Sequence, residues 1–326
     1  MKPSAAVAAT LCPKAEVRRG GLGGLGGLDD DVLAAVAYGP GGVRCADPRV
    51  VNIGLRALPR EAAVELWRAD GPVQQGEFGS IRYACRGDFL FGTIELDERD
   101  HGGIRGAGEA AYREISRFTA GRSERHLLRM WNYIASINDG RGDDERYKQF
   151  CLGRARGLDW LAGEALPAGT AVGRRDGSPL LQVCWLAGRE PGQPLENPRQ
   201  TQAYRYPRQY GPAPPSFCRA IVAPGGGLLV SGTASIVGSE SRHPGDLAQQ
   251  LEETGRNLRR LLETCYPGRQ RLPGPSLVKA YLRDADDAQA VQEALGRELP
   301  GAPHVLLLEA DICRAELLVE VECLFD

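Results

Sequence analysis

Short apolar runs separated by polar turns fill the chain from residue 50 onward, and their periods predict the elements. Runs of period two or of continuous apolar residues predict strands at 50–55, 62–69, 80–85, 89–96, 167–172, 180–188, 217–224, 228–238, 277–284, 305–308 and 317–321. Apolar residues at helical spacing predict helices at 123–135, 143–158, 246–265 and 288–299. This order is typical of an α+β fold, with mostly antiparallel sheets that carry helices on one face.

The last predicted strand carries two carboxylates. Alternation divides it into two faces, with Val319, Val321 and Cys323 on one and Leu318, Glu320, Glu322 and Leu324 on the other. A half-exposed face is the ordinary interpretation, because Asp and Glu are rarely buried without a partner. The alternative is that one carboxyl lies in an apolar cleft with its pKa raised, as a general acid requires.

Composition narrows the class of protein. The 326 residues are 42% hydrophobic, with a formal net charge of −2, which does not favour a nucleic-acid or anionic-membrane surface. No apolar run is long enough to span a bilayer, and residues 5–11 are too short for a signal peptide, so we expect a soluble cytoplasmic protein. Nine cysteines and four histidines are scattered singly, which predicts free thiols, no metal site and no cofactor.

Three short motifs recur about 140 residues apart and indicate a duplication. Residues 91–93 (FGT) correspond to 231–233 (SGT), 167–168 to 303–304, and 181–183 (LQV) to 319–321 (VEV). The predicted organisation is a flexible Gly/Ala-rich N-terminus at 1–45, a first domain at 46–190, a Tyr/Pro-rich linker at 191–216 and a second domain at 217–326.

The C-terminal motifs resemble those of the reactive-intermediate deaminase (YjgF-like) superfamily. Pro303 followed by the LVEVE strand at 318–322 is similar to the superfamily's closing signature, and places Glu320 on its active-site glutamate. The resemblance implies two tandem YjgF-like, chorismate-mutase-like α/β layers. Val305 stands where the deaminases carry a substrate-binding arginine, and the first repeat has Gln182 in place of the glutamate. Glutamine cannot supply an acidic proton, so only the second repeat is expected to be catalytic.

Longer stretches resemble one branch of that superfamily, the chorismatases. They are residues 126–138, 143–158, 197–220, 231–238 and 312–322, of which the tyrosine-rich 197–220 is the most specific. The resemblance implies cleavage of the enolpyruvyl ether of chorismate, with Glu320 as the acid that protonates the terminal methylene carbon. A hydrolase that releases a dihydrodiol is the nearest alternative. An imine deaminase and a non-catalytic binding protein for a small acid are the others.

Chorismate carries two carboxylates, which need cationic and hydrogen-bonding partners. The candidates for this role are Arg154, Tyr204, Arg208, Tyr210, Arg219 and Lys279. Family members that form 3-hydroxybenzoate, sometimes with 4-hydroxybenzoate alongside, have a cysteine at the position of Cys313, so this residue is a candidate for product specificity. Ala234 is a second one. The expected partner is the small substrate, with neither nucleic acid nor membrane, and the duplication predicts a monomer, with a trimer as the alternative.

Overall fold

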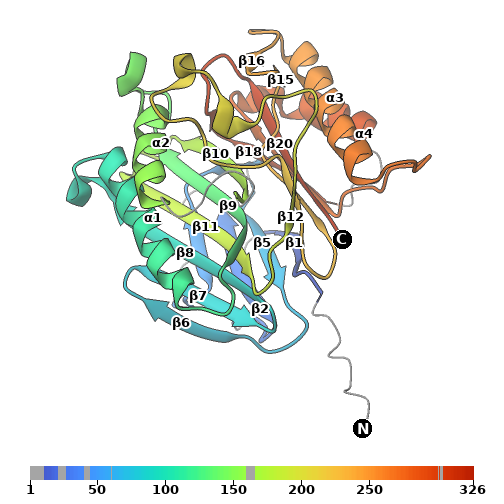
Figure 1. Ribbon diagram of the computed structural model, residues 1–326. Coiled ribbons are helices and arrows are strands. Elements are labelled where there is room, and N and C mark those ends of the chain that lie inside the picture. The colour runs from blue at the N-terminus through green and yellow to red at the C-terminus, as the bar shows by residue number, and fades with distance from the viewer. Residues whose placement is uncertain are drawn as a thin grey trace.

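The computed structural model describes residues 11–20, 27–39, 45–59, 61–158, 166–299, 301 and 304–326. Two seven-stranded sheets lie at the centre, with helices α1 and α2 on one side of the molecule and α3 and α4 on the other (Figure 1). Apolar side chains of both sheets face one another in one core, and each pair of helices covers a separate core on the outer face of its sheet. This is the α+β class that the sequence predicts.

The first large sheet has the strand order β19-β10-β9-β11-β8-β7-β6. Its strands are β6 (Gln74–Phe78), β7 (Ile81–Arg86), β8 (Phe89–Asp97), β9 (His126–Ala135), β10 (Ala168–Arg174), β11 (Leu180–Gly188) and β19 (Asp311–Ile312). Helices α1 (Ile104–Ala120) and α2 (Arg146–Gly157) pack on its outer face. Strands β9 and β10 are parallel, and the other neighbours are antiparallel.

The second large sheet has the order β12-β13-β14-β20-β17-β18-β4. Its strands are β4 (Arg56–Leu58), β12 (Gln193–Leu195), β13 (Ala220–Val222), β14 (Leu228–Val230), β17 (Leu277–Leu282), β18 (Val305–Glu309) and β20 (Val319–Phe325). Helices α3 (Leu247–Cys265) and α4 (Ala288–Glu298) pack on its outer face. Here too one pair, β17 with β18, is parallel.

The two large sheets repeat one topology. The order β10-β9-β11-β8-β7-β6 in the first matches β18-β17-β20-β14-β13-β12 in the second, with the parallel pair at the same place. Each sheet is then extended at one edge by a strand from the other half of the chain, β19 in the first and β4 in the second. This arrangement supports duplication, while the exact boundaries at 46–190 and 217–326 stay a prediction.

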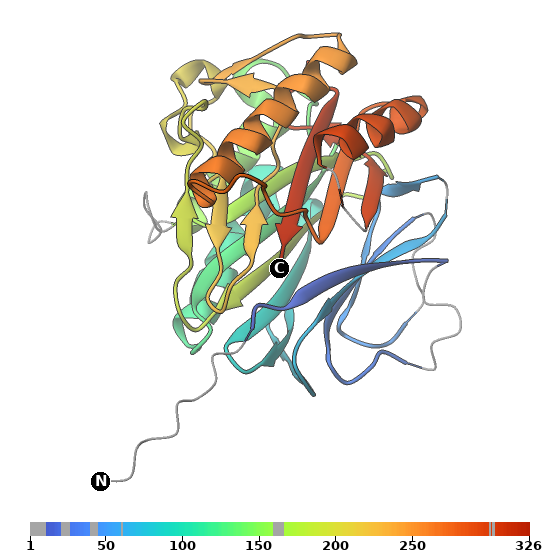
Figure 2. The same ribbon diagram turned by 90° about the vertical axis from the view of Figure 1, so that its right-hand side faces the viewer.

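A third sheet of four strands has the order β1-β5-β2-β3, and comprises β1 (Lys14–Arg19), β2 (Val32–Tyr38), β3 (Val50–Ile53) and β5 (Ala63–Arg68). Figure 2 shows these strands, in blue, below helices α3 and α4. The expectation of a flexible segment at 1–45 is therefore wrong for β1 and β2. Every residue of β2 is buried, so its run VLAAVAY has no polar alternation to mark it as a strand. Residues 21–26 of the glycine-rich stretch lie outside the described residues.

The structure differs from the predicted elements at several further places. Residues 126–135 form strand β9 rather than a helix, because both faces of this inner strand are covered and its apolar positions imitate helical spacing. Helix α1, over residues 104–120, was not predicted. Strands β18 and β20, which correspond to the predicted strands at 305–308 and 317–321, are not neighbours, because β17 lies between them. The segment predicted as a linker also contains β12 and two short 3-10 turns, Ala203–Arg205 and Arg208–Tyr210.

Two further findings concern membrane-spanning helices and the cysteines. Within the described ranges, no helix is long and apolar enough to cross a membrane. All nine cysteines carry free thiols, as predicted.

Candidate active site

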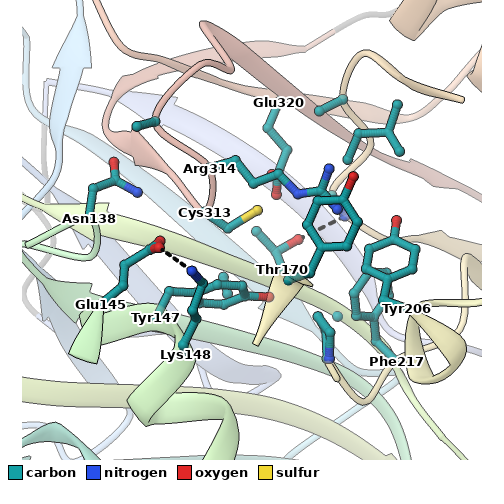
Figure 3. Close-up of a pocket in the computed structure, with 18 of the residues that line it drawn as sticks. Asn138, Glu145, Tyr147, Lys148, Thr170, Tyr206, Phe217, Cys313, Arg314 and Glu320 are labelled. Carbon is teal, nitrogen blue, oxygen red and sulfur yellow. Dashed lines mark hydrogen bonds and ion pairs between the residues drawn. The ribbon is translucent and has the colours of Figure 1, made fainter. Parts of the chain in front are cut away.

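A cavity of about 390 Å³ opens between the two halves of the chain (Figure 3). Strand β10 and helix α2 supply one wall from the first half. The rest comes from the segment 206–219, from residues 232–236 after β14, and from the β19–β20 connection together with β20 itself. The site is thus assembled at the junction of the two repeats.

Glu320 on β20 faces this cavity from the inner face of the second sheet. Strand alternation sends Val319 and Val321 outward into the core beneath α3 and α4, which leaves the carboxylates on the opposite face. Glu320 is only 5% exposed, so the half-exposed interpretation is wrong. Burial and then the negative charge of Glu322 raise the pKa of Glu320 to about 8, against the opposing effect of Arg129 and Arg219. The group is therefore mostly protonated at neutral pH.

Glu322 lies two residues further along the same face of β20, and its carboxyl is ionised rather than protonated. Burial opposes the charged form, but the Lys279 ammonium and the Arg129 guanidinium lower the pKa of Glu322 to about 2. The ion pairs measure 2.7 Å to Lys279 and 2.6 Å to Arg129, and the Thr170 hydroxyl donates a further hydrogen bond of 2.6 Å. Two neighbouring carboxyls with separated pKa values are a known arrangement for an acid beside a fixed anion.

Two buried arginines border the cavity, and each has at least one N–H donor without a hydrogen-bond partner among the described residues. Arg154 is 4% exposed and stacks on the Tyr112 ring, and its Nε and Nη2 have no hydrogen-bond partner among the described residues. Arg219 donates from Nη2 to the Tyr206 hydroxyl and to the Thr201 carbonyl, both at 2.8 Å, while its buried Nε has no partner in the described part of the chain. Buried guanidinium groups with unsatisfied N–H donors are suited to bind carboxylates.

Aromatic rings and a third arginine form another part of the cavity wall. The Arg314 guanidinium lies 3.9 Å from the Tyr210 ring centre and 5.2 Å from that of Tyr206, and the two rings are 5.5 Å apart. Figure 3 shows Arg314, Tyr206 and Phe217 among the residues that line the cavity. The cavity therefore combines flat apolar surfaces with cations, which fits a planar organic anion.

Comparison with known proteins identifies the family. The family model described as "Chorismatase FkbO/Hyg5-like, N-terminal" matches residues 65–187. A chorismatase from Streptomyces rapamycinicus is 35% identical over 90% of this chain and 92% of its own length. This chain belongs to the chorismatase family. A 3-hydroxybenzoate synthase from Streptomyces hygroscopicus is 33% identical over 83% of this chain and 84% of its own length. The crystal structure of a chorismatase superposes with a TM-score of 0.87 at 31% identity, covering 98% of this chain and 99% of the other.

Within this chorismatase fold, three of the six predicted substrate-binding residues line the cavity, namely Arg154, Tyr210 and Arg219. Ala234 and Cys313, the candidates for product specificity, line it too. Burial and the neighbouring Glu320 charge raise the pKa of the Cys313 thiol well above its usual range, so it stays neutral beside the carboxyl.

The other three are not on the cavity wall. Lys279 is buried between Glu65 and Glu322, at 2.9 and 2.7 Å, because its place in the middle of β17 points it into the core shared by the sheets. Arg208 lies on the surface with a side chain 65% exposed, where it pairs with Asp143. Tyr204 is placed in the 3-10 turn beneath the Arg205 guanidinium.

Several lining residues were missed. Arg314 follows Cys313 in the family-like stretch at 312–322, so the resemblance could have indicated it. Tyr147 and Lys148 precede Arg154 by two helical turns on α2, and Lys148 pairs with Glu145 at 3.1 Å. Thr170 reaches the cavity because the two halves of the chain pack together, and no local sequence pattern reveals that packing.

Among residues with described positions, no three His, Cys, Asp or Glu side chains come together as a metal site requires.

Gly232 offers a direct test of where the Glu320 carboxyl lies. A Cβ at this position would collide with Oε1 of Glu320 and come within 3.1 Å of the Thr170 hydroxyl. Gly232→Ala is therefore expected to displace the carboxyl and to lower kcat about a hundredfold, with little loss of Tm because a flexible side chain can move aside. Gly296→Ala, whose Cβ would meet nothing within 4 Å, is the matched control. Turnover by Gly232→Ala at the wild-type rate would contradict this geometry.

Proposed function

We propose that the protein cleaves the enolpyruvyl ether of chorismate to give pyruvate and 3-hydroxybenzoate, with Glu320 as the general acid. The observation that carries the proposal is the buried Glu320 carboxyl, with a pKa of about 8, in a cavity that is also lined by two buried arginines with unpartnered N–H groups. Cleavage of a dianionic enol ether requires an acid that is protonated at neutral pH, and binding of its two carboxylates requires two cationic groups.

In the proposed first step, Glu320 gives its proton to the terminal methylene carbon. A C–H bond forms from the π electrons of the enol double bond, the methylene becomes a methyl group, and the ether carbon becomes an oxocarbenium ion. The carboxylate that remains is stabilised by the positive charges of Arg129 and Arg219, which favour its ionised form. Arg129 is also held 2.6 Å from Glu322, so its position does not change as charge develops on Glu320.

The two carboxylates of chorismate are proposed to bind Arg154 and Arg219. Both side chains are already buried and oriented, by stacking on Tyr112 for Arg154 and by the two hydrogen bonds of Arg219. Little side-chain entropy is therefore lost when substrate binds. Tyr210, under the Arg314 guanidinium, is proposed to cover the ring of the substrate.

The proposed product follows from the second step. The oxygen of the ring hydroxyl beside the ether bonds to the ether-bearing ring carbon, the bond from that carbon to the ether oxygen breaks, and pyruvate leaves. The hydroxyl proton passes to the Glu320 carboxylate, which regenerates the acid. The epoxide then takes up one proton as it opens and loses one ring proton as it aromatises to 3-hydroxybenzoate, so no water is consumed. The similarity to a 3-hydroxybenzoate synthase and the neutral Cys313 thiol beside Glu320 support this route. Cys313 and Ala234 line the cavity, and we propose that these two residues determine which product forms. Capture by water, which gives a dihydrodiol, is the alternative product.

Incubation of the purified protein with chorismate, without added metal or nucleotide, tests the proposal. Liquid chromatography with mass spectrometry is expected to detect 3-hydroxybenzoate and pyruvate in equal amounts. Detection of pyruvate with a dihydrodiol would support cleavage of the ether but reject 3-hydroxybenzoate as the product. Recovery of unchanged chorismate would reject the activity.

A further inference from the structure

Four charged side chains form a buried network behind the cavity, which we call the core charge network: Glu65 on β5, Lys279 on β17, Glu322 on β20 and Arg129 on β9. Each is at most 3% exposed. The Lys279 Nζ lies 2.9 Å from Glu65 and 2.7 Å from Glu322, and Arg129 Nη2 lies 2.6 Å from Glu322. The network thus joins the N-terminal sheet to both large sheets.

Both carboxyl groups of the network accept hydrogen bonds from fixed side-chain donors. Glu65 accepts hydrogen bonds from the Trp67 indole at 2.9 Å and the Tyr38 hydroxyl at 2.8 Å. Glu322 accepts from the Trp131 indole at 2.9 Å and from Thr170 at 2.6 Å. At Glu322, the ammonium of Lys279, the guanidinium of Arg129 and the Thr170 hydroxyl together lower the pKa and favour the carboxylate.

The core charge network is electrically balanced, because its two cations match its two anions. Glu320 shares the inner face of β20 with Glu322, and no cation of the network is left over to pair with it. A balanced network beside a buried carboxyl leaves the desolvation of that carboxyl uncompensated, which favours its protonated form.

We propose that Glu65 is a positioning residue for the acid: acting through Lys279 and Glu322, it keeps the core charge network neutral and so keeps the proton on Glu320. The inference rests on the proposed function, in which Glu320 is the acid. It assigns a role to a residue of the N-terminal sheet that does not touch the cavity.

The titratable groups that face the two carboxyls come from several elements packed around them. The residues around Glu320 are Glu322, Lys279 and Tyr281 on β20 and β17, Arg129 on β9, Tyr147 and Arg154 on α2, and Arg219, Cys313, Arg314 and Glu316 on the connecting segments. Those around Glu65 are Tyr38, Tyr133, Tyr281, Cys184 and Lys279. Burial raises the pKa values of these tyrosines and of both cysteines, so none of them carries charge at neutral pH.

Removing the Glu65 charge leaves a net positive network, which favours ionised Glu320. Glu65→Gln is therefore expected to move the alkaline limb of kcat/KM for chorismate to lower pH by about 1 unit, a loss of about tenfold on the falling limb. Arg129→Gln leaves a net negative network and moves the limb to higher pH. The double variant is balanced again, and its limb returns to the wild-type position. Glu124→Gln, which removes a buried carboxylate paired with Arg122 outside the network, leaves the limb in place.

The same shifts can be followed without turnover. Titration of the Glu320 carboxyl by ¹³C NMR, assigned with the E320Q variant, is expected to show the same order of midpoints, E65Q below wild type and R129Q above it. If chorismate is not turned over, the proposed function fails, and this titration still decides the present inference. A folded E65Q with an unmoved Glu320 midpoint overturns it. Where E65Q does not fold, R129Q and the double variant decide: equal midpoints in the two overturn the inference.

Discussion

Replacing Glu320 by glutamine is expected to lower kcat for chorismate cleavage about a thousandfold, the size of effect usual for a positioned general acid. Glutamine keeps the shape and the polarity of the side chain but has no acidic proton. Because Glu320 is 5% exposed and protonated at neutral pH, its removal takes away the proton donor that the proposed mechanism needs. The measurement is the rate of pyruvate release at saturating chorismate, with substrate binding followed separately by calorimetry.

The control for this variant is Glu124→Gln, which changes an equally buried carboxyl that lies away from the cavity. It is expected to keep the wild-type kcat. Retention of more than a tenth of the wild-type kcat by folded Glu320→Gln would contradict the assignment of the acid.

Replacing Arg154 by glutamine is expected to raise KM for chorismate about a hundredfold. A guanidinium with two buried, unpartnered N–H groups can form two charge-assisted hydrogen bonds to one carboxylate, worth about 3 kcal/mol together. That energy corresponds to a factor of about 150 in binding. Steady-state kinetics separate the expected change in KM from a change in kcat.

Arg208→Gln is the matched control, since it removes a guanidinium that pairs with Asp143 on the surface and does not line the cavity. Its KM is expected to stay within about twofold of wild type, because exposed ion pairs contribute little. Equal KM values for the two variants would show that Arg154 does not bind a substrate carboxylate.

The face that Glu320 occupies could be predicted from strand alternation, and the resemblance to the YjgF-like superfamily singled out Glu320 from Glu322 on that face. The buried position of Lys279 could not be predicted in this way. Strand β17 was predicted, but nothing local says that a lysine in its middle meets Glu65, 214 residues earlier in the chain. A buried ion pair between distant segments is a tertiary property, so the lysine was assigned to the substrate instead.

The errors in secondary structure have a related cause. Strand β9 has neighbours on both sides and apolar cores on both faces, so its hydrophobic residues do not alternate. The fully buried β2 lacks alternation for the same reason. Helix α1 has apolar residues at helical spacing, but Gly106 and Gly108 lower its helix propensity. Gly106 is needed there, because a Cβ at this position would collide with the backbone carbonyl oxygen of His101.

The measurement that tests the central claim most directly is the pH dependence of kcat/KM for pyruvate release from chorismate. The pKa of Glu320 is raised to about 8, and the acid works only when protonated. Activity is therefore expected to be present below this value and to fall about tenfold per unit above it, because kcat/KM reports the ionisation of the free enzyme. A rate that rises through pH 8, or that stays level to about pH 10, would contradict a protonated Glu320 as the catalytic acid.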